Sequence, residues 1–490
     1  YTNNVVPSTT GFAGAGSVII QPIALGSFAS AFTPNYTFAS TLTGLTLGSS
    51  SNTQAMTLAS NIGITGPIAV YGGSITQNAG VSITSGGGDI TYTTAGGGFT
   101  ASDDKAISIG ATTGSRSVIN AGGGNITLSG SWGTTGVAGG GDYAIWMFGS
   151  DIKTSGAGTI KITGDATNST TTSGGVYGVN MGNGSLIQTE SGALSITGTG
   201  GKASAYSRGV VVDTQALKVL SRSGAITLKD LQAVGLTGTY LGFYVKPSAS
   251  ADVYFGSDGS TVLSGASSTT SSSNITVQAD KANFLANTYK TTVNTSGAVV
   301  VESIGNAFTA DVDATALGVT GGASSVRIGK TTNTGNIILG SAITAAGPIT
   351  VYGGNITLNT DLTSTNLNSA IKLFATGAIT NNTGLRTITT NGGAVLFAAD
   401  TDGNDNGNIR FLNGLTIDTR LGLAGSKSSA TTGGGAITLA GGNMSGSGYA
   451  AGTSSTAAAG IRVDYGLTVL SGGGDINLRG KGWVGSVGSG

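Results

Sequence analysis

Residue types that carry much of enzyme chemistry are scarce in this sequence. Its 490 residues include 0 His and 0 Cys, so Ser-His-Asp triads, cysteine nucleophiles and the usual zinc sites are excluded. Glutamate stands only at Glu190 and Glu302. The chemistry that remains is that of aspartate carboxylates and of asparagine, serine and threonine oxygens.

Two aspartate pairs are candidates for acid and base carboxylates. Asp103 and Asp104 precede Lys105, whereas Asp311 and Asp313 would share one face if their segment is a strand. Paired carboxylates beside Lys or Arg would suit a glycosidase or polysaccharide lyase acting on the flank of the fold. Isolated Asp pairs among Gly, Ser and Thr are more often solvated turn residues. We interpret both pairs in this way, and the sequence favours a protein that is not an enzyme.

The densest acidic stretch alternates oxygen-bearing side chains with glycine. Asp400, Asp402, Asn404 and Asn406 are candidate calcium ligands, because a hard cation takes carboxylate and amide oxygens from a backbone that glycines allow to curl. Counted from Asp402, the stretch fits the first half of a calcium loop, but Asn413 replaces the bidentate Glu at the twelfth position. A polar turn explains the stretch equally well. Calcium is the only cofactor that the sequence suggests.

Two aromatic clusters have two interpretations. They are Tyr143–Phe148 and Leu241–Tyr244. Alternation along a strand would expose either Trp146 and Phe148 or their neighbours, which would make a patch for a sugar or a protein. The alternative is packing inside a wider turn of the fold, and we favour it.

Three Asn-Ile-Thr triplets match a glycosylation sequon. They begin at Asn125, Asn274 and Asn355. A turn asparagine followed by a strand is sufficient to explain each of them, because Asn suits a turn and β-branched residues suit an extended chain.

The elements that must position these residues come from internal repetition. Gly66–Thr76 and Gly347–Thr357 differ at two of eleven positions, and each reads as a strand, a Gly-Gly turn and a second strand. A shorter pattern, Gly-x-Ile-Thr-Leu in several spellings, recurs along most of the chain. Its first apolar positions include Ile126, Ile160 and Leu194, which are 34 residues apart. Such a regular period predicts a solenoid.

The repeats also predict what each coil contains. Tyr143, Ile145, Met147 and Ile152 are echoed 34 residues later by Tyr177, Val179, Met181 and Leu186. Each repeat carries three short alternating segments that are separated by Gly, Ser, Thr or Asn, the pattern of short strands. The sequence therefore predicts an all-β fold, a right-handed parallel β-helix (β-solenoid) with about three short strands per turn.

The regularity of the repeats divides the chain into four expected regions. Residues 1–60 are irregular and are expected to form an N-terminal cap or an inter-subunit strand segment. Residues 61–230 carry the 34-residue repeats, residues 231–480 continue the β-helix with variable loops, and residues 481–490 form a C-terminal tail.

Composition limits the partners. Charged residues make up 9% of the chain and the formal net charge is +0. Lys and Arg are scattered singly, so the sequence lacks the basic patch that nucleic acid or an anionic membrane would need. We expect no nucleic-acid partner and no membrane-spanning segment, since no apolar run approaches the length of a transmembrane helix.

Several repeats resemble those of large bacterial exoproteins of the filamentous haemagglutinin type. The resemblance is carried by Gly435–Leu439 and by the run Gly335–Thr344 that leads into Gly347–Tyr352. It implies export, often by two-partner secretion, and a β-helical fibre at the bacterial cell surface or released from it. The Asn-Pro-Asn-Gly motif of that family's secretion domain is not found. On this basis we expect an extracellular location.

These observations lead to one main functional hypothesis and two alternatives. The main hypothesis is an extracellular structural or adhesive protein whose copies join end to end by strand addition, with itself as the chief partner. One alternative is a β-helix that binds or cleaves carbohydrate, with host or environmental glycans as partners. The other is the shaft of a larger secreted adhesin or toxin.

Overall fold

The computed structural model shows a chain built from stacked β-strands. It describes residues 11–23, 26–96, 104–133, 141–169, 174–202, 206–232, 239–247, 252–263, 269–285, 289–422, 427, 432–454 and 457–483, without the side chain of Thr214. No α-helix occurs among these residues. The chain divides into two compact units, Tyr1–Gln278 with Asn287–Tyr289, and Ala279–Ala286 with Lys290–Gly490.

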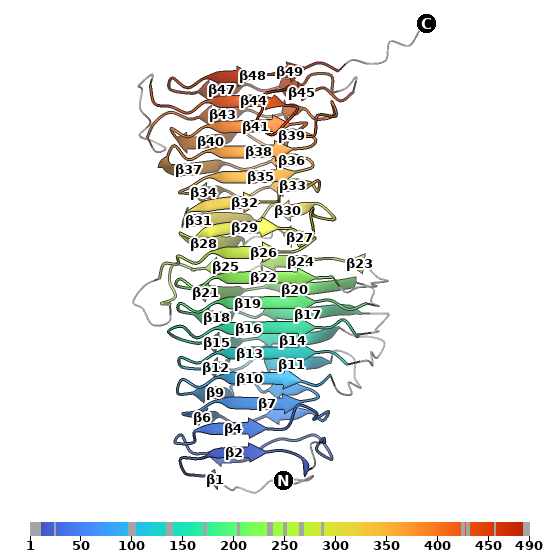
Figure 1. The fold of residues 1–490 in the computed structure, drawn as a ribbon, viewed down its shortest axis with the longest axis vertical. Coiled ribbons are helices and arrows are strands. Elements are labelled where there is room, and N and C mark those ends of the chain that lie inside the picture. The colour runs from blue at the N-terminus through green and yellow to red at the C-terminus, as the bar shows by residue number, and fades with distance from the viewer. Residues whose placement is uncertain are drawn as a thin grey trace. The chain divides into compact units, whose positions relative to one another are not determined.

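In the first unit, successive strands visit three parallel sheets in turn, so that three strands make one coil (Figure 1). The first sheet contains β2 (Ser17–Ile20), β4 (Gly44–Leu47), β7 (Ile68–Gly72), β10 (Ile90–Thr94), β13 (Ile126–Ser131), β16 (Ile160–Asp165), β19 (Leu194–Thr199), β22 (Ile226–Leu231) and β26 (Ile275–Gln278). The second contains β5 (Met56–Leu58), β8 (Ile75–Gln77), β11 (Lys105–Gly110), β14 (Asp142–Phe148), β17 (Gly175–Gly182), β20 (Tyr206–Gln215) and β24 (Phe243–Pro247), and β23 (Thr239–Tyr240) pairs with β20. The third contains β6 (Ile62–Ile64), β9 (Ser82–Ser85), β12 (Ser117–Asn120), β15 (Ser150–Lys153), β18 (Ser185–Thr189), β21 (Leu217–Ser221) and β25 (Val253–Gly256), whereas β1 (Gly11–Phe12) pairs with β3 (Thr37–Phe38).

The second unit repeats this plan. Its first sheet contains β29 (Ala298–Glu302), β32 (Ser325–Ile328), β35 (Ile349–Gly353), β38 (Ile371–Ala375), β41 (Val395–Ala399), β44 (Ile437–Gly441) and β48 (Ile476–Leu478). The second contains β27 (Ala282–Phe284), β30 (Val312–Ala314), β33 (Ile337–Leu339), β36 (Ile356–Leu358), β39 (Ile379–Asn381), β42 (Ile409–Phe411) and β46 (Ile461–Val463). The third contains β28 (Thr291–Asn294), β31 (Leu317–Ala323), β34 (Ile343–Ala345), β37 (Leu362–Leu367), β40 (Arg386–Asn391), β43 (Leu415–Asp418) and β47 (Leu467–Leu470), and β45 (Ala450–Ala451) pairs with β49 (Gly480–Lys481).

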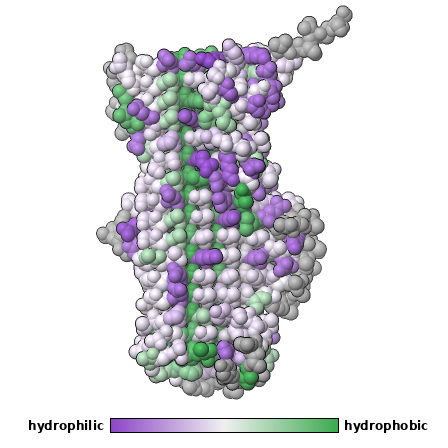
Figure 2. Space-filling view, in the orientation of Figure 1, coloured by the Kyte–Doolittle hydropathy of each residue, from purple (hydrophilic) through white to green (hydrophobic). Residues whose placement is uncertain are grey.

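The predicted parallel β-helix is therefore confirmed, with three strands per coil. Within each unit the first-sheet strands cross the front from left to right while later coils lie higher in the view, which makes the coils right-handed (Figure 1). Alternation explains the core: in β13, Ile126 and Leu128 are fully buried, whereas Thr127 between them points outward. Most of the outer face of the first sheet is accordingly pale, the colour of intermediate hydropathy, with hydrophilic residues in isolated places and narrow green lines of hydrophobic residues between the pale columns (Figure 2).

The predicted repeat register is correct in the first and second sheets and wrong by one residue in the third. Ile126 pairs with Ile160, which pairs with Leu194. Ile152, however, pairs with Ile187 rather than with Leu186. One residue at positive φ, Gly149, separates β14 from β15, whereas two, Asn183 and Gly184, separate β17 from β18. The longer turn delays the next strand by one residue.

The boundaries of the β-helix also differ from those expected. Within the region expected to be a cap, β2 and β4 already belong to the first sheet and pair in register. Regular pairing thus begins before residue 61. Residues 1–10 of that region, and residues 484–490 of the expected tail, lie outside the described residues.

Candidate functional site

The candidate calcium loop connects β41 to β42 in the second unit. Asp400, Gly403 and Asp405 have φ angles of 54°, 69° and 60°, values that let the chain reverse direction within a few residues. The N–H of Gly403 donates to the carbonyl of Asp400 at 3.0 Å. The loop is therefore curled, as the alternation of glycine and polar residues suggested.

Asp400 faces into the protein. Its exposed fraction is 1%, and its Oδ1 accepts the backbone N–H of Asn406 at 3.2 Å. Burial raises the pKa of the Asp400 carboxyl, and the nearby charges of Asp402 and Asp405 act in the same direction. Asp400 thus holds the loop closed.

The other candidate ligands lie on the exposed side of the loop. Asn404 donates its Nδ2 to Asp402 Oδ2 at 2.9 Å, and Asp405 forms an ion pair of 2.7 Å with Lys481. The described residues contain no group of three or more His, Cys, Asp or Glu side chains that could hold a metal ion. Calcium binding by Asp400, Asp402, Asn404 and Asn406 stays a prediction.

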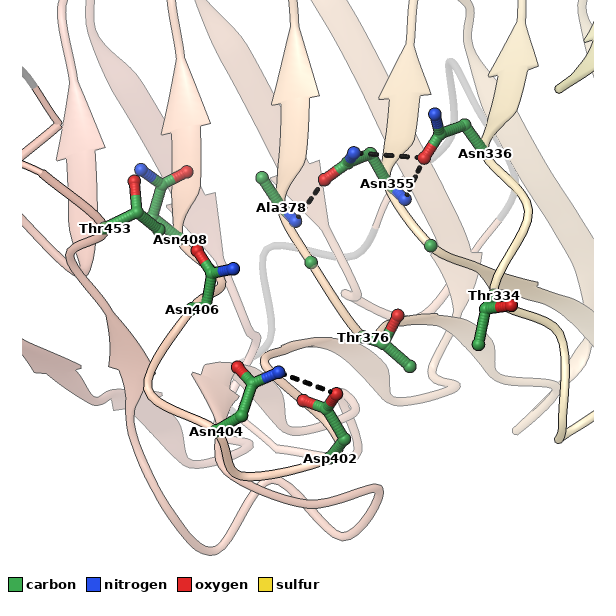
Figure 3. Close-up of a pocket in the computed structure, with 12 residues that line it drawn as sticks. Thr334, Asn336, Asn355, Thr376, Ala378, Asp402, Asn404, Asn406, Asn408 and Thr453 are labelled. Carbon is green, nitrogen blue, oxygen red and sulfur yellow. Dashed lines mark hydrogen bonds between the residues drawn. The ribbon is translucent and has the colours of Figure 1, made fainter.

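The exposed side of this loop forms one wall of a groove. The groove has a volume of about 410 Å³ and lies entirely within the second unit. Its other wall is the column of turns that lead from the first sheet into the second, on successive coils (Figure 3). The lining residues are Thr334, Asn336, Gly354, Asn355, Thr376, Gly377, Ala378, Asp402, Asn404, Asn406, Asn408 and Thr453.

A ladder of asparagines forms the column. Asn336 donates its Nδ2 to Asp311 at 2.9 Å and accepts the backbone N–H and the Nδ2 of Asn355 at 2.7 and 3.0 Å. Asn355 Oδ1 in turn accepts the N–H of Ala378 at 2.8 Å. Figure 3 shows the bonds from Asn336 to Asn355 and from Asn355 to Ala378, which cross from one coil to the next. Each residue precedes a second-sheet strand, so pairing in register stacks the side chains.

The asparagines of two of the sequons belong to such ladders. In the first unit, Asn125 donates its N–H and Nδ2 to Asp89 at 2.8 and 3.2 Å, and its Oδ1 accepts the N–H of Thr159 at 2.9 Å. Asn355 makes the same kind of contacts in the second unit, but it precedes β36 of the second sheet, whereas Asn125 precedes β13 of the first sheet. The interpretation as turn asparagines therefore holds for both, and each side chain forms hydrogen bonds to the coils on either side.

The candidate carboxylate pairs are also engaged in turns. Asp311 accepts the bond from Asn336, and Asp313 Oδ1 accepts the N–H and the Oγ1 of Thr315 at 3.0 and 2.7 Å. Both point outward from the segment of β30, as predicted for a strand. Asp104 is half-buried, and Asp103 lies outside the described residues.

The aromatic clusters lie on the second sheet of the first unit. Ile145 and Met147 are buried in the core, whereas Tyr143 and Trp146 are half-buried on the outer side. The Tyr143 ring stacks on Tyr177, with centroids 4.9 Å apart, and the Trp146 ring stacks on Phe148 at 4.3 Å. Because each ring covers the face of another, these faces are less open to a sugar.

The partners of these aromatics were not expected from the sequence. Tyr177 meets Tyr206 edge to face at 6.2 Å, and the Arg208 guanidinium lies 3.9 Å from the centroid of Tyr244. Phe243 of the second cluster is buried in the core. The Tyr143 and Tyr177 echo was a signal for the stack, because equivalent residues of successive coils lie side by side.

Comparisons with known proteins add no relative. No family model, no curated protein and no solved structure matches this chain. Within the described part of the chain, the structure contains no helix with the length and apolar character that a membrane crossing requires.

Proposed function

We propose that this chain is an extracellular structural protein of a bacterial surface, a non-catalytic β-helix whose copies join head to tail by adding one coil to the next. The fold supports a structural role, because coils stacked by strand pairing can extend without limit. The resemblance of the repeats to filamentous haemagglutinin-type exoproteins supports the proposed location. The observation that carries the proposal concerns the last coil of the second unit.

The last coil leaves core positions open. Ile437 and Leu439 of β44 are fully buried, but Ile476 and Leu478, their partners in β48, are 48% and 51% exposed. β46 and β47 are likewise the last strands of their sheets in the described residues. Their inward apolar residues are half-buried. Among the residues that the structure describes, this surface therefore combines apolar side chains with strand edges that pair on one side only, which favours strand addition.

The first coil offers a matching surface. Val18 and Ile20 of β2 align with the buried Leu45 and Leu47 of β4, yet both are half-buried. Strand β2 ends the first sheet on that side, among the described residues. Placing β2 of a second copy beside β48 would continue the same aliphatic column. Because the two surfaces differ, the contact repeats in one direction and gives an open filament.

Electron microscopy and sedimentation of the 490-residue chain test this proposal. We expect filaments or concentration-dependent oligomers, and their loss when Ile476→Lys and Leu478→Lys are combined, because a buried unpaired charge opposes strand addition. Thr438→Lys is the control, since Thr438 is the outward residue between Ile437 and Leu439 on the preceding strand. A monomer at every concentration, or assembly that the double variant leaves intact, would count against head-to-tail joining. A monomer would favour the shaft of a larger secreted protein.

A further inference from the structure

The groove beside the β41–β42 loop is lined partly by polar side chains that form no hydrogen bond with another described residue. Among the residues that the structure describes, the side chains of Thr334, Thr376, Asn406, Asn408 and Thr453 form no hydrogen bond, yet all of them line the groove. They lie beside ladder asparagines whose side-chain oxygen and nitrogen both form hydrogen bonds. The groove thus has a fixed wall and a set of available donors and acceptors.

Asn408 is the most informative of these residues. Its exposed fraction is 6%, and its carbonyl holds the N–H of Ile379, so the backbone is fixed on the second sheet. The residue below it in the column is Ala378, which offers no side-chain partner and interrupts the ladder. The Asn408 amide forms no hydrogen bond within the described residues and is not among their fully buried polar atoms, so it meets solvent in the groove. A ligand hydroxyl in the groove would replace that solvent.

The charge of the lining restricts the ligand. Asp402 is the one ionisable side chain among the lining residues, and Asp400 adds negative charge close by, whereas the charge of Asp405 is paired with Lys481. An anionic ligand would be repelled. The remaining groups are amides, which offer a donor and an acceptor together, and hydroxyls, which offer both on one atom. This set suits a neutral ligand that is rich in hydroxyl groups.

We propose that this groove binds a neutral saccharide chain, with Asn408 and Asn406 as the main contacts and Thr334 and Thr376 as further ones. Thr334 and Thr376 belong to different coils, on the turns that precede β33 and β39. A linear saccharide lying along the column would therefore meet a threonine hydroxyl on each of these two turns, with Gly354 on the coil between them. Figure 3 shows the amide of Asn404 and the carboxylate of Asp402 on the side of the groove opposite the column of turns. The inference does not depend on head-to-tail assembly.

The test is direct binding of neutral oligosaccharides, with panels of glucose-, galactose- and mannose-based hexasaccharides as probes. Binding is measured by titration calorimetry on the full chain with EDTA present, so that calcium makes no contribution. We expect one panel member to bind, and Asn408→Leu to weaken its affinity about ten-fold through the loss of its amide contacts. Asn406→Ala, on the exposed loop, is a second variant that leaves the coil intact.

The matched control is Thr416→Ala. Thr416 points outward from β43, on the third sheet of the same coil, away from the lining residues. Circular dichroism checks that each variant is folded. The proposal is overturned if no neutral hexasaccharide binds at millimolar concentration, if only acidic polysaccharides bind, or if both asparagine variants bind as tightly as the control.

Discussion

Asn336 and Asn355 stack on successive coils, and one oxygen joins them: Oδ1 of Asn336 accepts both the backbone N–H and the Nδ2 of Asn355, at 2.7 and 3.0 Å. The ladder continues to the next coil, where Asn355 Oδ1 accepts the N–H of Ala378. Removal of the Asn355 side chain therefore breaks two hydrogen bonds in the ladder. We expect Asn355→Ala to destabilise the local structure by about 1–2 kcal/mol.

Hydrogen exchange is the appropriate measurement for the ladder, since a stacked repeat opens locally before it unfolds as a whole. Peptides covering β33, β36 and β39 should exchange faster in Asn355→Ala. Thr357→Ala is the matched control, because Thr357 points outward from the middle of β36. Equal exchange in the two variants would show that the ladder contributes little.

Asp400 should make stability depend on pH in an unusual direction for an aspartate. Its pKa is raised above the ordinary value of 3.8, first by burial. The folded state thus binds its proton more tightly than the unfolded state does, so this residue favours folding at low pH, and the contribution fades as pH rises above about 4. Asp400→Asn should remove the buried charge, keep the positive φ that asparagine tolerates, and stabilise the loop at pH 7.

The measurement for Asp400 is the unfolding midpoint against pH. We expect the midpoint difference between Asp400→Asn and the parent chain to grow from pH 4 to pH 7. Asp402→Asn, on the exposed part of the same loop, controls for the loss of one negative charge. A gain that is the same at every pH would show that protonation of Asp400 is not the cause.

The calcium prediction has a separate test. If the β41–β42 loop holds a calcium ion, millimolar calcium chloride should raise the unfolding midpoint by mass action, and EDTA should reverse the rise. Asp402→Ala should abolish the effect, since Asp402 is the exposed carboxylate among the four candidate ligands. Magnesium chloride at the same concentration controls for ionic strength. No shift with calcium would leave the loop as a polar turn.

Much of the fold could be predicted because inward positions repeat. Ile126, Ile160 and Leu194 recur at a fixed interval, and each is buried and pairs with the next. The third sheet was harder, because its register depends on how many residues the preceding turn contains. The pairing of Ile152 with Ile187 follows from a turn lengthened by one residue.

The groove could be predicted only in part. Asp402, Asn404 and Asn406 were predicted as calcium ligands, because the stretch alternates oxygen-bearing side chains with glycine. Asn408 and Thr376 were not, since the coils of the second unit differ in length and no fixed interval aligns them. Their juxtaposition depends on strand pairing, which places Ile379 beside Ile409 and hence Ala378 beside Asn408.

Asp258 should stabilise the first unit through hydrogen bonds more than through its ion pair. Its carboxylate accepts the N–H groups of Ser260 and Thr261 at 3.0 and 2.6 Å, the Oγ1 of Thr261 at 2.6 Å, and lies 2.6 Å from Lys218 Nζ. Burial raises the pKa of Asp258, but the bonds from Lys218 and Thr261 outweigh this and leave it below the ordinary 3.8. The stabilisation is therefore present above about pH 4 and is lost as pH falls further.

We expect Asp258→Ala to cost about 2–3 kcal/mol, measured by hydrogen exchange over β25 and the residues after it. Lys218→Met should cost less than about 1 kcal/mol, because the lysine is 39% exposed and its attraction is screened by salt. Equal losses in the two variants, together with strong salt dependence, would instead assign the stabilisation to the ion pair.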